Sequence, residues 1–177
     1  MSKTTTLVRI VANYGHQYLG LLNDSRTDDE QPQWVQLVAR GKKQGYAVGD
    51  VVQVTLTNTS STPAQGAIEK VHERRNLFYR SEFNKQKNLA ANIDQVAIIC
   101  ATEPGFSEEL LGRALICAHV ADIEALIVLN KIDVAELLPF ARERLALYQS
   151  LGYRVIEVSA NQENSLQNEL IPALAGQ

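Results

Sequence analysis

The spacing of apolar residues divides the chain into two parts. Up to about residue 74, apolar and polar positions alternate over short runs, which is the period of half-buried β-strands. Turn residues separate five such runs, which lie at 6–14, 19–22, 34–40, 50–56 and 66–74. Five short strands predict a small closed β-barrel, either a five-stranded OB-fold, which we favour, or an SH3-like barrel.

From residue 93 the period changes. Three continuous apolar runs predict strands that are buried on both faces, and a segment with helical spacing follows each of them. The strands are expected at 95–101, 125–130 and 153–160, and the helices at 107–120, 135–151 and 164–175. Ser107 is suited to begin the first helix, and Gly152 is suited to end the second. This βαβαβα order predicts a partial α/β domain with a parallel sheet.

The charge distribution supports the same division. The net charge is −3, but residues 1–90 hold 12 Lys and Arg against 8 Asp and Glu, whereas residues 91–177 hold 5 against 12. We therefore expect a barrel over 1–74 that faces a polyanion, a basic linker over 75–92 and an acidic α/β domain over 93–177.

Composition narrows the class of protein. Hydrophobic residues make up 45% and charged residues 21%, as in ordinary globular proteins. No apolar run approaches the roughly 18 residues of a membrane span, and the first residues do not resemble a secretory signal. Cys100 and Cys117 lie in apolar segments and are interpreted as buried thiols rather than a disulfide. We expect no membrane partner and a cytoplasmic location.

The candidate chemistry follows two of the predicted strands. Asn130, Lys131, Ile132 and Asp133 come directly after the second strand, and Ser159 and Ala160 end the third. Ligands of parallel α/β sheets bind at the carboxyl ends of strands, so both segments are expected at one edge.

Each residue type suits recognition of a guanine base. A carboxylate at Asp133 can accept hydrogen bonds from the ring N–H and the exocyclic amine, a donor pair that adenine lacks. Lys131 can lay its aliphatic stem along the base or ribose, and Asn130 can bridge the base and nearby backbone. The backbone N–H of Ala160, which follows Ser159, can donate to the guanine carbonyl.

A second group of residues suits contact with RNA. The basic positions of the first part can follow phosphates, and Tyr46, Phe78 or Tyr79 is available for stacking on bases. The candidate RNA-binding residues are Arg40, Lys42, Lys43, Arg74, Arg75 and Arg80, with Lys70, Lys85 and Lys87 nearby.

The order of these features resembles that of the circularly permuted GTPases that depend on the small ribosomal subunit. The resemblance is carried by the barrel, by VHER at 71–74, by ANIDQ at 91–95 and by NKID at 130–133, and it covers nearly the whole chain. It implies an OB-fold that contacts small-subunit rRNA, a site for the base of GTP or GDP, and a role in late small-subunit maturation coupled to GTP hydrolysis.

The sequence also departs from that family. Family members continue into a phosphate-binding loop, two switch regions and a zinc-binding module, so Mg²⁺ and Zn²⁺ are expected for the full-length family. No G-x-x-x-x-G-K-[ST] occurs in these residues. Because the phosphate-binding loop is missing from these residues, we expect no catalytic residue here. The Cys and His residues show no zinc spacing, so we expect no metal ligand either.

Two functions remain open. The chain is either the front part of a ribosome-maturation GTPase, inactive alone, or a non-catalytic module that binds RNA or the ribosome. In both cases an apolar strand such as 95–101 or 153–160 is expected at an edge of the sheet, where it would promote self-association.

Overall fold

A computed structural model describes residues 5–22, 32–40, 45–82 and 85–175. The chain forms two compact units, Met1–Ile93 and Asp94–Gln177. In the described part of the chain, no helix is long and apolar enough to cross a membrane.

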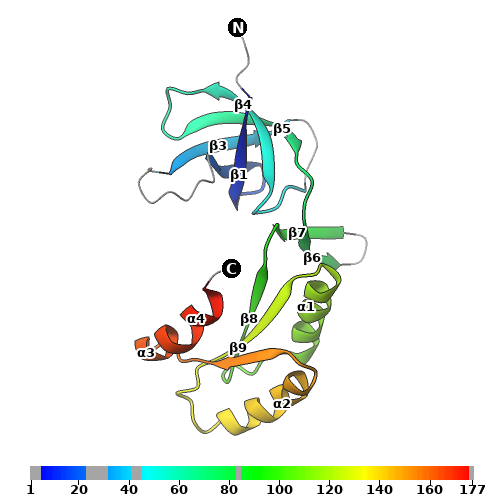
Figure 1. The fold of residues 1–177 in the computed structure, drawn as a ribbon, viewed down its shortest axis with the longest axis vertical. Coiled ribbons are helices and arrows are strands. Elements are labelled where there is room, and N and C mark those ends of the chain that lie inside the picture. Colours follow the sequence, from blue (N-terminus) through cyan, green and yellow to red (C-terminus); the bar gives the residue numbers. More distant parts are fainter. Residues whose placement is uncertain (1–4, 23–31, 41–44, 83–84, 176–177) are drawn as a thin grey trace. The chain divides into compact units, whose positions relative to one another are not determined.

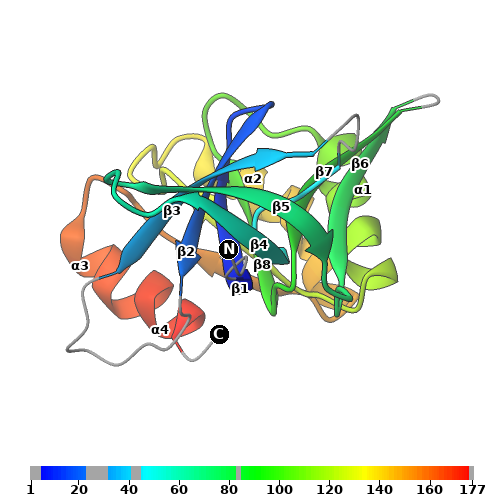
Figure 2. The ribbon, with the colours of Figure 1, turned by 90° about the horizontal axis from the view of Figure 1, so that it is seen from above.

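The first unit contains a closed barrel of five strands (Figures 1 and 2). The strands are β1 (Thr5–Asn13), β2 (Gln17–Leu22), β3 (Gln33–Ala39), β4 (Val51–Asn58) and β5 (Ala64–Val71). Their order around the barrel is β1-β2-β3-β5-β4. β3 and β5 pair in parallel and the other neighbours are antiparallel. This topology is that of the five-stranded OB-fold, which was the favoured prediction.

The alternation in the sequence becomes the inside and outside of this barrel. Val8 and Ile10 on β1, Leu37 on β3 and Val52 on β4 belong to the core, and each is at most 1% exposed. Burying such side chains contributes about 1.5–3 kcal/mol each. Trp34, on β3, is 43% exposed.

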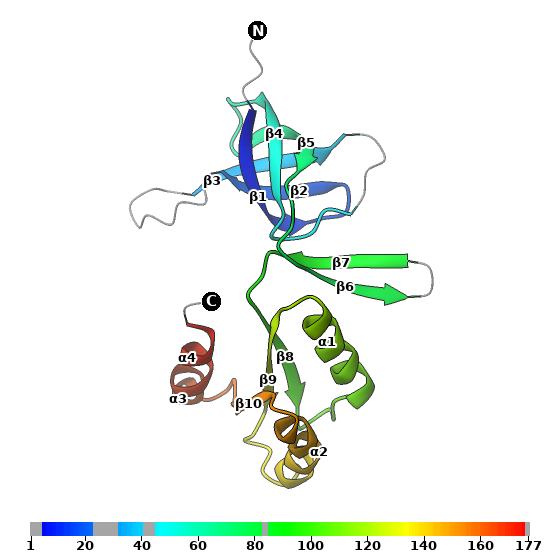
Figure 3. The same cartoon turned by 45° about the vertical axis from the view of Figure 1, so that its right-hand side comes forward.

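The segment interpreted as a linker is structured. β6 (Leu77–Glu82) and β7 (Lys85–Ala91) form a two-stranded antiparallel sheet (Figure 3). The sequence pattern did not indicate this hairpin, because apolar and polar residues do not alternate along β6 (LFYRSE) or β7 (KQKNLAA). Its stability comes from contacts with the barrel, since an isolated hairpin is marginal in water.

The second unit is a three-stranded parallel sheet with helices on both faces. Its elements are β8 (Gln95–Ala101), α1 (Glu108–Val120), β9 (Glu124–Asn130), α2 (Leu138–Ser150), β10 (Arg154–Glu157) and a last helical segment formed by α3 (Glu163–Ser165), a π-helical turn (Leu166–Leu170) and α4 (Ile171–Leu174). On β9, Ile127 and Leu129 pack with buried residues of α1 and α2, whereas Leu126 and Val128 pack towards the last helical segment.

One expectation about burial is wrong. The apolar run of β8 was predicted to be buried on both faces, but Ile99 is 59% exposed. The strand order β10-β9-β8 places β8 at an edge of the described sheet, which is the position that was also expected for an apolar strand such as 95–101. On α1, Leu111, Leu115 and Ala118 are buried, whereas Leu110 is 66% exposed.

Candidate functional site

The two segments singled out in the sequence meet at the carboxyl edge of the sheet. β9 and β10 are parallel neighbours in which Leu129 lies opposite Glu157. The backbone continues this pairing beyond the strands, because Val158 N–H donates to Leu129 C=O at 2.8 Å and Ile132 N–H donates to Val158 C=O at 3.3 Å. The loops after the two strands therefore lie side by side, as predicted.

Asn130 ties the two loops together. Its Oδ1 accepts hydrogen bonds from the backbone N–H of Lys131 at 2.8 Å and from that of Ala160 at 3.1 Å. Lys131 has a positive φ of 64°, which turns the chain out of the strand. Thr102, after β8, donates through Oγ1 to the Lys131 carbonyl at 2.9 Å. The predicted contact of Asn130 with neighbouring backbone is therefore present, and its contact with a base stays a prediction.

Asp133 and Ser159 form the shortest of these contacts. Ser159 is fully buried, and its Oγ donates to Asp133 Oδ1 at 2.6 Å. This hydrogen bond is the main reason why the pKa of Asp133 is lowered, with smaller contributions from its own backbone N–H, from Asn161 and from Lys131. The carboxylate is exposed and stays ionised near neutral pH, so it can accept further donors.

Ser165 is a member of this site that the sequence analysis missed. Its Oγ accepts from the Ser159 backbone N–H at 2.9 Å, so the last helical segment holds the backbone of the residue that orients Asp133. Thr102 was missed as well. The only signal for either residue is a hydroxyl side chain near a strand end, which is too common to single them out.

The geometry presents a preoriented carboxylate beside a lysine and a backbone loop. Such an arrangement can accept two adjacent N–H donors on a planar ring, which is the donor pair of guanine. The Ala160 N–H, expected to donate to the guanine carbonyl, donates to Asn130 here. A bound carbonyl would share this N–H or take it over.

The candidate RNA-binding residues have different surroundings. Arg40 is half-exposed and pairs with Glu69 at 2.8 Å. Arg75 and Arg80 are exposed. Arg75 lies two residues before β6, and Arg80 lies on this strand. Lys42 and Lys43 lie outside the described residues. The guanidinium of Arg74 binds the buried Asp50 at 2.7 Å, so part of its hydrogen-bonding capacity is used within the first unit, and its predicted contact with RNA stays a prediction.

No metal centre is evident among the described residues, where no group of three or more His, Cys, Asp or Glu side chains could hold an ion. Cys100 is buried and Cys117 is half-buried, and neither forms a disulfide. Burial raises the pKa of the Cys100 thiol. A structural role is the simplest interpretation of this cysteine.

The fold and the site define a class of protein. An OB-fold barrel precedes a parallel sheet that carries NKID and then Ser159 and Ala160, so the candidate base-binding segments follow the barrel in the sequence. This is the element order of a circularly permuted GTPase. A family model described as RsgA GTPase matches residues 71–177. The chain belongs to the RsgA GTPase family.

Curated relatives support the same assignment. A protein of Burkholderia pseudomallei named small ribosomal subunit biogenesis GTPase RsgA is 46% identical over 95% of this chain and 51% of its own length. A protein of the same name from Paraburkholderia phymatum is 49% identical over 85% of this chain and 44% of its own length. The chain thus spans about half the length of the curated relatives that it matches.

Solved structures share the fold. YjeQ from Thermotoga maritima superposes with a TM-score of 0.65 at 22% identity, over 98% of this chain and 58% of that protein. YloQ, described as a circularly permuted GTPase, gives a TM-score of 0.59 at 22% identity, over 96% of this chain and 56% of that protein.

Proposed function

We propose that the second unit binds the base of GTP or GDP at Asn130, Lys131, Asp133, Ser159 and Ala160. The observation that carries this proposal is the Ser159–Asp133 hydrogen bond, which holds an ionised, exposed carboxylate next to Lys131. Asp133 accepts the two guanine donors, Lys131 covers one face of the ring, and the loop at Ala160 approaches the carbonyl. Contacts to the base alone hold one end of the ligand, so the affinity of these residues is around millimolar.

The Asp133→Asn variant tests this base site. The change replaces one acceptor by a donor, so the preference shifts from GDP towards XDP, and GDP affinity falls about tenfold or more because a charge-assisted pair is removed. Ligand-observed NMR competition between GDP and XDP measures the shift. Glu136→Gln, an exposed carboxylate-to-amide change three residues away, is the matched control. An unchanged GDP-to-XDP ratio in Asp133→Asn would show that the base binds elsewhere.

We also propose that the first unit binds small-subunit rRNA and that the chain acts in maturation of the small ribosomal subunit, in the cytoplasm. The support is the excess of basic residues in 1–90 on an OB-fold, a barrel that commonly binds oligonucleotides. Arg40, Lys42, Lys43, Arg75 and Arg80 are the proposed phosphate contacts. The names of the relatives are consistent with this role.

Salt dependence tests the RNA contact. Neutralising Arg40, Lys42 and Lys43 together should flatten the slope of log affinity against log salt by about 0.7–0.9 for each phosphate that these side chains bind in the parent. Filter binding of purified small ribosomal subunits at several salt concentrations measures the slope. An unchanged slope would move the contact away from the end of β3, and the β6–β7 hairpin would be tested next.

The second candidate function is a non-catalytic module that binds RNA or the ribosome. The charge of the first unit favours it, because RNA contact there needs no nucleotide. The two functions differ in linkage. If guanine nucleotide changes the affinity for ribosomal subunits, and the Asp133→Asn variant abolishes this effect, the base site participates; if nucleotide has no effect, the module alone explains the binding.

A further inference from the structure

Among the described residues of the first unit, one charged side chain is fully buried, and it lies where the barrel meets the hairpin. This residue, Asp50, directly precedes β4 and is 0% exposed. It accepts hydrogen bonds from Arg74 Nε at 2.7 Å, from Arg74 Nη2 at 2.8 Å and from the backbone N–H of Ala47 at 2.8 Å. A carboxyl group buried this deeply is retained only with such partners, because a buried polar group without hydrogen bonds is costly.

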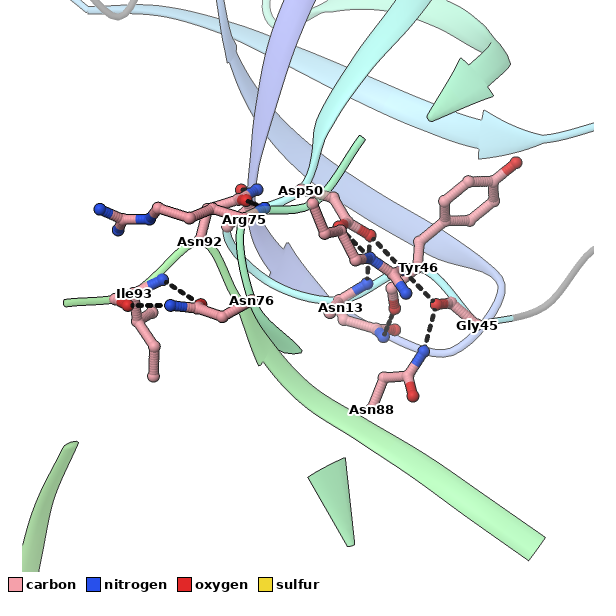
Figure 4. A network of polar contacts seen from close by, with 12 residues as sticks. Asn13, Gly45, Tyr46, Asp50, Arg75, Asn76, Asn88, Asn92 and Ile93 are labelled. Atoms are coloured by element: carbon pink, nitrogen blue, oxygen red, sulfur yellow. Dashed lines mark hydrogen bonds and ion pairs between the residues drawn. The ribbon is translucent and has the colours of Figure 1, made fainter. Parts of the chain in front are cut away.

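The same arginine reaches the loop before Asp50, where Arg74 Nη2 donates to the Gly45 carbonyl at 2.9 Å. Asn88 Nδ2 on β7 donates to the same carbonyl at 2.6 Å (Figure 4). One backbone oxygen of the barrel is therefore held both by the segment that enters β6 and by β7.

The end of β7 is fastened to the barrel by further contacts. The Ala91 N–H donates to Val48 C=O at 2.8 Å, and Asn92 Nδ2 donates to Gly49 C=O at 2.9 Å. Asn92 Oδ1 accepts from the Arg75 N–H at 2.7 Å. Gly49 has a φ of 89°, and a Cβ there would lie 2.0 Å from the Ala91 oxygen, so only glycine permits this approach.

We propose that the Asp50–Arg74 pair, with Asn88 and Asn92, is a latch that fixes the β6–β7 hairpin to the barrel so that both bind one RNA partner as a single surface. Arg74 is then a positioning residue and not a phosphate contact. The inference rests on the proposed RNA binding and deepens it, because it says how the cations of two separate elements act together.

The physical reason is preorganisation. The hairpin carries exposed basic residues, including Arg80, Lys85 and Lys87, on a sheet of only two strands. Without the latch, this sheet would become ordered only when RNA binds, and the free energy of that ordering would weaken binding. With the latch, the sheet is already ordered in the folded protein. Asp50 itself is buried and cannot touch RNA, so any effect of Asp50 on binding must pass through the position of its partners.

The test compares two carboxylate-to-amide changes in the full chain. Asp50→Asn weakens the latch, whereas Glu73→Gln makes the same change in charge at an exposed position beside Arg74. If charge alone governed binding, removal of either carboxylate would strengthen the affinity for purified small ribosomal subunits. With the latch, Asp50→Asn lowers this affinity about tenfold while Glu73→Gln leaves it unchanged or slightly raises it.

A milder variant keeps the test valid if Asp50→Asn unfolds, since breaking a buried ion pair is costly. Asn88→Ala removes one hydrogen bond to Gly45 and leaves no buried charge unpaired. It should lower subunit affinity by a smaller factor and accelerate hydrogen exchange of the Ala91 amide, with the slope against salt unchanged.

The outcomes separate the two proposals. If the parent chain binds subunits and a folded latch variant binds equally well, the latch is overturned while RNA binding stands. A decrease in the salt slope on replacing Arg74 by Gln, by the amount of one phosphate contact, would also overturn the positioning role. If the parent chain binds no subunits, the proposed RNA contact is wrong, and the latch as an RNA-positioning device fails with it.

Discussion

The acidity of Asp133 is set by one neighbour more than by any other. The hydroxyl of Ser159 donates to the ionised carboxylate, and a donor that favours the charged form lowers the pKa. Ser159 is itself fixed, because it is buried and its backbone N–H is held by Ser165. The carboxylate proposed to recognise guanine is therefore charged and oriented before a ligand arrives.

Replacing Ser159 by Ala should raise the pKa of Asp133 towards its ordinary value. A group with a lowered pKa in the folded state contributes stability above its unfolded pKa, and this contribution is lost as the pH falls through the folded value. In the variant this contribution should therefore be smaller, and guanine recognition, which needs the ionised carboxylate, should be lost at a higher pH than in the parent. An NMR titration of the Asp133 carboxyl carbon measures the change.

The control for this titration is Ser150→Ala. The hydroxyl of Ser150 donates to the Leu147 carbonyl on α2, so its removal deletes a comparable hydrogen bond outside the site. The Asp133 titration should be identical in Ser150→Ala and the parent. Equal titrations in Ser159→Ala and the parent would show that another donor sets the acidity of Asp133.

At the scale of single residues, the sequence indicates which residues are candidates for a site better than it indicates which residues contact one another. Asn130 and Asp133 could be recognised because they follow an apolar run at fixed spacing. The ion pair between Asp50 and Arg74 could not be recognised, because its members are 24 positions apart and nothing local marks either as buried. Arg74 was consequently placed among the RNA contacts, on its charge alone.

At the scale of elements, the start of α1 is a feature that the sequence and the structure share. Ser107 is the N-cap, and its side chain accepts from the Leu110 N–H at 3.3 Å. Glu108 and Glu109 stand in the first turn, where negative charge is favourable to the helix dipole. The helix begins here because the Ser107 side chain accepts a hydrogen bond from one of the first N–H groups, which have no acceptor within the helix.

Ser107→Ala should lower the free energy of unfolding of the second unit by about 1 kcal/mol, through removal of the cap. Urea denaturation followed by circular dichroism measures the shift in midpoint at constant slope. Ser150→Ala again serves as control, since that hydroxyl lies at the other end of a different helix. A change of less than a few tenths of a kcal/mol would mean that solvent replaces the cap.

The errors at this scale have a common origin. β8 is as apolar as β9, but it lies at an edge of the described sheet, so the same composition gives an exposed Ile99 in one strand and buried side chains in the other. The β6–β7 hairpin is the converse case, because its strands lack an alternating pattern and are held by hydrogen bonds to the barrel loop 45–50. Burial and pairing depend on the neighbouring element, which periodicity along one segment does not report.

At the scale of the whole molecule, the chain combines a proposed RNA-binding unit with a proposed base site and matches about half of its relatives' length. Base contacts select a nucleotide but contribute little to phosphoryl transfer. Catalysis of that step comes from a phosphate cradle, a magnesium ion and groups that position water. These residues include the segments proposed to select the base, but they contain no G-x-x-x-x-G-K-[ST] segment.

The 177 residues on their own should therefore hydrolyse GTP no faster than the buffer, even with small ribosomal subunits present. Release of inorganic phosphate from GTP, followed over hours at protein concentrations near the expected millimolar affinity, measures this. The Asp133→Asn variant identifies any contaminating GTPase, because a contaminant's rate would not depend on Asp133. Subunit-stimulated phosphate release that the parent shows and Asp133→Asn abolishes would contradict the prediction, and it would require a phosphate site within the described loops at the carboxyl ends of β8, β9 and β10.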